Sequence, residues 1–193
     1  MTVDRDDAQQ ALEEIGRTQD RVGRVHSYAD MAPFLIIWGA IWAFANLVTE
    51  IRPAWSNAAW LAGLVVGVPL TTFLGIVQSR RRAARLQQAG ADAKSFGMRS
   101  ALSMAAILLF LASVLAVTGP VDARQANAAI SLFWAFVYMG VGAWIGMRLV
   151  LIGAVTAVVI LFAYFALDQH YYLVMGAAAG GSLILGGLWL RKI

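Results

Sequence analysis

The chain contains no cysteine and only two histidines, His26 and His170. The missing thiols exclude disulfide bonds, thiolate metal sites and cysteine nucleophiles. The two histidines fall on opposite sides of the membrane in the topology predicted below, so they cannot ligate one haem. HExxH and GxSxG motifs are also missing, and no serine in an apolar stretch has a base nearby in the pattern. We therefore expect neither an enzyme nor a resident cofactor.

Charge is scarce as well, since only 13% of the 193 residues are charged, 60% are hydrophobic and the mean hydropathy is +0.69. A soluble domain is far less apolar than this, so the composition predicts a bilayer protein. Six stretches without Asp, Glu, Lys or Arg are each at least about 19 residues long, which is enough for an α-helix to cross. We predict an all-α integral membrane protein with six transmembrane helices, over residues 31–49, 56–78, 100–118, 127–146, 148–167 and 171–190.

Basic residues are distributed unevenly among the hydrophilic segments. Thirteen of the fifteen lysines and arginines fall on one side of the predicted membrane, and only Arg52 and Arg124 fall on the other. The positive-inside rule then predicts a bacterial-type inner-membrane protein with both termini in the cytosol and a cytosolic basic loop at residues 79–99. The acidic start of the chain does not resemble a signal peptide, so the first span should be an uncleaved anchor. This topology and the anionic lipid surface account for the pI near 9.9, so we expect no nucleic-acid partner.

Residues 1–30 form a second predicted unit, a cytosolic amphipathic helix that precedes the membrane domain of residues 31–193. Its apolar residues recur at spacings of three, four and seven, which is typical of a narrow stripe along one helix face. The unit carries seven acids against four arginines, and the 79–99 loop carries six bases against one acid, so the two should attract. They are either solvated helices that anchor the topology or a recognition surface for a partner. The residues expected to dock are Ile15, Val22, Arg80, Arg81 and Arg82.

Small residues indicate how the spans pack, because close van der Waals contact drives helix association in lipid. Three spans contain a GxxxG pair, for which packing inside the chain is the default interpretation and homodimerisation the alternative. The connection at 146–148 is so short that we expect a tight hairpin in preference to one long tilted helix. The three pairs are Gly63 with Gly67, Gly142 with Gly146, and Gly176 with Gly180.

Pro69 lies in the middle of a span, where it removes a backbone hydrogen bond and predicts a kink. Thr71 and Thr72 follow closely enough to bond to freed carbonyl groups. Together with Asn46 they mark where a polar path would run. Hydrogen bonding between helices is the default role of such residues.

Aromatic residues could also form a pocket. Trp38 and Trp42 lie one helical turn apart, as do Trp134 and Tyr138, so they could line a site for a flat apolar ligand. Such residues more often face lipid or fill the core.

The external rim carries the remaining candidate ligands. Asp168 and His170 could supply two metal ligands, but a metal site needs at least a third. The default interpretation of the charged rim residues is loop solubility with an ion pair between loops.

No span carries a charged residue or a histidine in its middle. Proton-coupled transporters and many ion pathways place such residues at membrane depth, so their absence disfavours those functions. We predict a non-catalytic accessory, assembly or regulatory subunit, embedded in the lipid bilayer, that docks on a protein partner or a second copy through its spans and N-terminal helix. A small transporter or channel for a neutral or apolar solute is the alternative.

Overall fold

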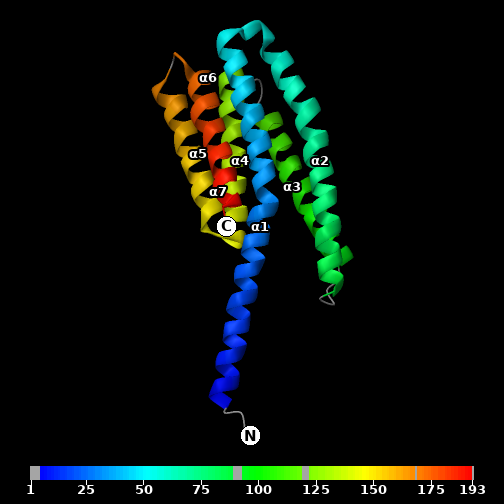
Figure 1. Ribbon diagram of the computed structural model, residues 1–193. Helices are drawn as coiled ribbons and strands as arrows, with labels where there is room; N and C mark the ends of the chain where they lie inside the picture. The colour runs from blue at the N-terminus through cyan, green and yellow to red at the C-terminus, as the bar shows by residue number, and fades with distance from the viewer. Residues whose placement is uncertain (1–4, 89–92, 119–121, 168, 193) are drawn as a thin grey trace.

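The computed structural model describes residues 5–88, 93–118, 122–167 and 169–192, which are helical almost throughout and contain no strand. Successive long helices run in opposite directions (Figure 1). The last three elements follow each other without a break and form one helical segment. In chain order the elements are α1 (Arg5–Ile51), the 3₁₀ helix η1 (Pro53–Trp55), α2 (Ser56–Gln88), α3 (Ala93–Thr118), α4 (Ala123–Ile145), α5 (Met147–Ala166), α6 (Tyr171–Val174), the π-helix η2 (Met175–Gly180) and α7 (Gly181–Arg191).

Five to six of these helices are long and apolar enough to span a membrane. In α3 the described apolar stretch is the shorter segment Ala106–Thr118. Each span predicted from the sequence lies within one helical segment, except for a single residue at the end of the fourth and fifth spans, while α1, α2, α3 and α4 extend beyond their predicted spans. The all-α class and the multi-pass character are therefore supported. The five longer stretches are Val25–Ile51, Pro53–Arg81, Ala123–Ile145, Met147–Ala166 and Tyr171–Arg191.

The helix α1 extends well past the others. The boundary at residue 30 between the two predicted units lies inside this helix, since Arg5–Ile51 is continuous and contains Pro33. A proline removes one backbone hydrogen bond and can bend a helix without ending it. The turns before Tyr28, which is buried in the core, leave the bundle and run on with no other described helix beside them (Figure 1). We call residues 5–27 the arm.

The two ends of the bundle carry different charges. The arm, the end of α2, the α4–α5 turn and the end of α7 all lie toward one end of the bundle, and the tip of the arm extends well beyond the end of α7 (Figure 1). We call this end the basic end, because it carries Arg80, Arg81, Arg148, Arg191 and Lys192. The opposite end carries Glu50, Arg52, Asp122, Arg124 and His170.

A close backbone contact joins α1 to η2 in the centre of the bundle. A Cβ atom built on Gly180 would lie 2.9 Å from the Ala43 nitrogen and 3.0 Å from the Gly39 carbonyl oxygen. A Cβ atom on Gly176 would lie 3.0 Å from the Ala43 carbonyl oxygen. Such distances leave no room for a side chain on either glycine, so the Gly176–Gly180 pair packs against α1 of the same chain.

The helices α4 and α5 form a tight hairpin, as expected from the short connection. Gly146 joins them with a φ of +150°, a backbone conformation that favours glycine, and its N–H donates to the Gly142 carbonyl oxygen at 2.7 Å. A Cβ atom on Gly142 would lie 2.5 Å from the Val150 nitrogen. A side chain at Gly146 would collide with the Tyr28 hydroxyl, so the turn also packs on α1.

The helices α2 and α3 lie at the side of the bundle. α2 packs on α1 through Gly63 and Gly67, which both face Ile41, and α3 packs on α2. Most large apolar side chains of α2 and of the described part of α3 are exposed, as expected for helices surrounded by lipid. These include Leu61, Val65, Val66, Phe73, Leu102, Leu109, Phe110 and Val117.

We predict that Gly180→Ala destabilises the bundle by about 1–3 kcal/mol, because the added methyl group would push α1 and η2 apart. Gly181→Ala is the matched control, since nothing lies within 4 Å of a Cβ atom built there. Thermal unfolding in detergent, followed by circular dichroism, should give a lower melting temperature for Gly180→Ala alone. Equal melting temperatures for both variants would contradict the close contact.

Candidate functional site

Amide and hydroxyl groups form a cluster inside the bundle, toward the opposite end. Asn46 of α1 is fully buried, and its amide donates to the Trp42 carbonyl oxygen at 3.0 Å. Asn127 of α4 donates to the Asn46 side-chain oxygen at 3.2 Å. The Tyr171 hydroxyl of α6 donates to the Asn127 side-chain oxygen at 3.1 Å. This amide cluster (Asn46, Asn127 and Tyr171) therefore links three helices where lipid offers no alternative partners.

Arg124 lies next to the amide cluster, in the first turn of α4. Its guanidinium group donates to the carbonyl oxygens of Tyr164 at 2.5 Å and Leu167 at 2.8 Å, at the end of α5. Its charge also lies 4.9 Å from the Tyr171 ring centre. A cation is stabilised at a helix C-terminus by the helix dipole and by carbonyl groups that lack a partner within the helix. The interpretation of Arg124 as a loop charge was wrong, because it is half-buried and holds α4 to α5.

The sequence contained a signal for this role that the analysis missed. The Asp122 carboxylate accepts a hydrogen bond from the Gln125 N–H at 2.6 Å and caps the start of α4. An Asp followed by Gln three residues later is typical of a helix start. With this cap, α4 begins at Ala123 and not at the predicted residue 127, so Arg124 lies in its first turn.

Glu50, in the last turn of α1, lies beside His170, which directly precedes α6, at the opposite end. The Glu50 carboxylate lies 3.0 Å from Nδ1 of His170, whose side chain is 71% exposed. Such an exposed pair contributes little to stability. Asp168, the second predicted metal ligand, lies outside the described residues. Within the described ranges no group of three His, Cys, Asp or Glu side chains could hold a metal ion.

The predicted aromatic residues lie in contacts between helices. Trp38 points toward α2, where its ring lies 3.3 Å from a Cβ atom built on Gly67. Trp42 and Trp134 pack against the buried cluster that contains Tyr138. The Trp42 indole N–H is buried with no acceptor among the described residues. Three of the four residues thus share one cluster, and Trp38 lies apart from it.

The residues predicted for a polar path are not brought together. The Thr71 hydroxyl donates to the Gly67 carbonyl oxygen of its own helix at 2.7 Å, and Thr72 is exposed. Asn46 bonds to α4 instead, as described above. α2 continues as a helix through Pro69. The Thr71 hydroxyl therefore bonds only within α2 in the contacts described, whereas Asn46 bonds within α1 and to α4.

The predicted docking residues lie at the basic end or along the arm. Arg80 and Arg81 are exposed in the last turns of α2. The backbone places Ile15 and Val22 in the arm and Arg82 in α2, but their side chains lie outside the described ones.

The expected attraction between residues 1–30 and the 79–99 loop does not bring the two helices alongside each other. The arm runs away from the end of α2 (Figure 1). α2 meets α1 at the base of the arm, where the Gln78 side chain donates to the Asp30 carbonyl oxygen at 2.9 Å. The predicted basic loop is largely helical, since α2 continues to Gln88 and α3 begins at Ala93.

No known protein family, curated protein or solved structure matches this chain. The features of the chain that bear on its function are the arm, the amide cluster with Arg124, and the basic end.

We predict that Arg124→Gln destabilises the protein by about 2–4 kcal/mol, because two carbonyl groups at the end of α5 lose a charged donor. Arg52→Gln serves as the control, since Arg52 is exposed and its side chain makes no cap to η1. Thermal unfolding in detergent should separate the two variants by several degrees. A loss of stability in Arg52→Gln as large as in Arg124→Gln would refute the cap.

Proposed function

We propose that the protein is a non-catalytic accessory or regulatory subunit of an inner-membrane complex and contacts its partner through the arm. The observation that carries the proposal is the continuity of α1. One helix contains both the arm and the segment that packs on η2 and α7, so a partner on the arm is joined to the centre of the bundle through a single continuous helix. The arm has no neighbouring helix in the described chain (Figure 1).

The arm sequence favours a protein partner over a membrane surface. Ala8, Ile15 and Val22 repeat every seven residues, and Leu12 and Val25 extend the same apolar face. Membrane-surface helices favour lysine and arginine opposite bulky Trp, Phe or Leu. This arm instead combines a polar face of five acids and four arginines with a narrow aliphatic stripe that has no Trp or Phe, which suits a groove or a neighbouring helix on a partner.

The bundle supports a role in anchoring. Polar side chains within its spans engage neighbouring helices, as in the pair of hydroxyl groups of Thr156 and Ser182, which lie 2.9 Å apart between α5 and α7. The amide cluster does the same between α1, α4 and α6. Groups that bind each other in this way stabilise a fixed arrangement of helices.

We predict that Ile15→Asp combined with Val22→Asp lowers recovery of the partner about tenfold or more, because two charges would enter the centre of the interface. A photo-crosslinking amino acid at residue 15 or 22 should give one discrete product in cells. Its mass spectrum should identify the same protein from both positions.

The matched control is Gln10→Asp combined with Arg17→Asp, which places two aspartates on the opposite face of the same helix. This variant should retain the partner, and crosslinkers at residues 10 and 17 should give little product. Equal recovery with both double variants would contradict docking through the stripe.

We also propose that the basic end faces the cytosol, as the positive-inside rule favours. The absence of cysteine allows a clean test with Ala54→Cys in η1 and Ser79→Cys in α2, both at exposed positions. A membrane-impermeant maleimide should label Ala54→Cys in intact cells and Ser79→Cys only after permeabilisation. The reverse labelling pattern would overturn the orientation.

A further inference from the structure

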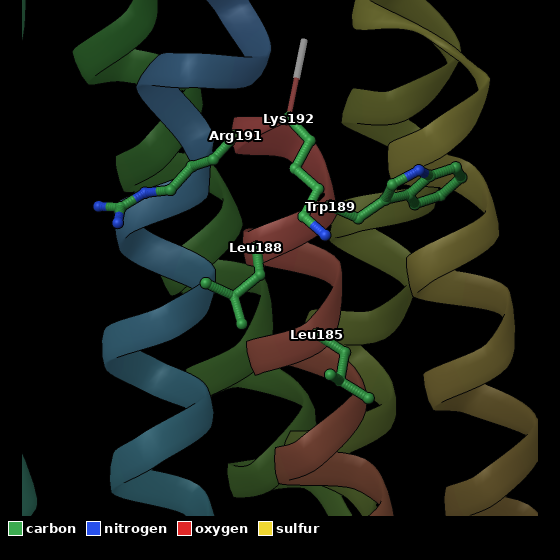
Figure 2. Close-up of a pocket in the computed structure, with 5 residues that line it drawn as sticks. All are labelled: Leu185, Leu188, Trp189, Arg191 and Lys192. Atoms are coloured by element: carbon green, nitrogen blue, oxygen red, sulfur yellow. The ribbon is translucent and has the colours of Figure 1, made fainter.

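A hollow of about 370 Å³ opens on α7 at the basic end (Figure 2). Leu185 and Leu188 form its apolar part and are 69% and 43% exposed. Trp189, Arg191 and Lys192 complete the lining toward the end of the helix. The hollow therefore has an apolar half facing the middle of the span and a cationic half at its end.

Two positive charges line this hollow, and a third, that of Arg148, lies against the Trp189 ring. Arg191 and Lys192 are exposed at its rim. Figure 2 shows Arg191 and Trp189 pointing to different sides of α7. The Trp189 ring lies 4.8 Å from the guanidinium carbon of Arg148 in the first turn of α5, a distance at which the ring attracts a cation. None of the described residues that line the hollow is acidic.

The position of the hollow along α7 matches a membrane boundary. The apolar helical stretch that could span ends at Arg191, so Leu185 and Leu188 lie at acyl-chain depth and the two cations lie at headgroup depth when α7 crosses a bilayer. Tryptophan is enriched at this boundary, where its ring is partly apolar and its N–H is polar.

We propose that this hollow is a binding site for one anionic phospholipid. An acyl chain would lie along Leu185 and Leu188, and the headgroup phosphate would lie between Arg191 and Lys192. Basic pockets beside transmembrane helices on the cytosolic side suit anionic headgroups. A zwitterionic lipid would bring its own cation against the three positive charges, and a free phosphate ion would leave the apolar half of the site empty. Binding here does not depend on the proposed partner.

Quenching of tryptophan fluorescence by brominated lipid tests the site directly. The full-length protein would be reconstituted into phosphatidylcholine vesicles that contain increasing fractions of brominated phosphatidylglycerol or, in a parallel series, brominated phosphatidylcholine. The difference between the wild-type protein and Trp189→Phe isolates the quenching of Trp189 among the seven tryptophans. We expect half-maximal quenching of Trp189 at an about tenfold lower fraction of the anionic lipid than of the zwitterionic lipid.

Charge variants separate a site from general surface attraction. Arg191→Gln with Lys192→Gln should remove the preference, so that both lipids quench Trp189 at similar fractions. Arg80→Gln with Arg81→Gln is the matched control, since these exposed arginines lie at the same end of the bundle but do not line the hollow. This control should keep the preference.

Three results would overturn the proposal. The first is equal quenching of Trp189 by both lipids in the wild-type protein. The second is an equal loss of preference in the control variant, which would indicate surface charge alone. The third is release of the anionic lipid by inorganic phosphate, which would show that the anion binds without its chain. The lipid preference of Trp189 and the recovery of the partner are measured independently. If one fails while the other is retained, only the corresponding proposal is overturned.

Discussion

The close contact between α1 and the segment formed by η2 and α7 is the constraint on which the rest of the structure depends. Inside lipid no hydrophobic force draws helices together, so the bundle relies on dispersion contacts that weaken within an ångström of added separation. Gly39 and Gly180 permit this approach, and Gly187 repeats it nearer the basic end against the Ala32 carbonyl oxygen. Because α1 also packs on α2 and contains the arm, its contact with η2 and α7 positions α2 and the arm as well.

A second set of interactions holds the ends of the α4–α5 hairpin. At the basic end Gly146 turns the chain, and the Tyr28 hydroxyl of α1 occupies the space that a side chain would need. At the opposite end Arg124 binds the last carbonyl groups of α5, next to the amide cluster. At both ends the hairpin is held by contacts within the protein, which the low dielectric of the bilayer strengthens. The hairpin is therefore fixed at two places about a helix length apart.

The sequence predicted the helices well and their neighbours poorly. Length and the absence of charge locate each apolar helix, and the charge of residues 79–88 did not hide the continuation of α2. The pattern changes from amphipathic to apolar near residue 30, where we placed a boundary between two units, but the pattern does not show that both units share the continuous helix α1. The neighbours of Trp38, Asn46 and Arg124 could not be predicted, because core-facing and lipid-facing sides are both apolar and hydropathy does not distinguish them.

The proline in α1 has a mechanical consequence. Pro33 cannot donate to the Ala29 carbonyl oxygen, so the helix has one hydrogen bond fewer beside the base of the arm and bends there most easily. At 1.5 Å per residue the 23 residues of the arm (5–27) extend about 35 Å, so a bend of about 10° moves the tip by about 6 Å. The arm is in effect a lever with its pivot at the edge of the bundle. A small bend at the base of the arm therefore displaces the surface that a partner would contact by several ångströms.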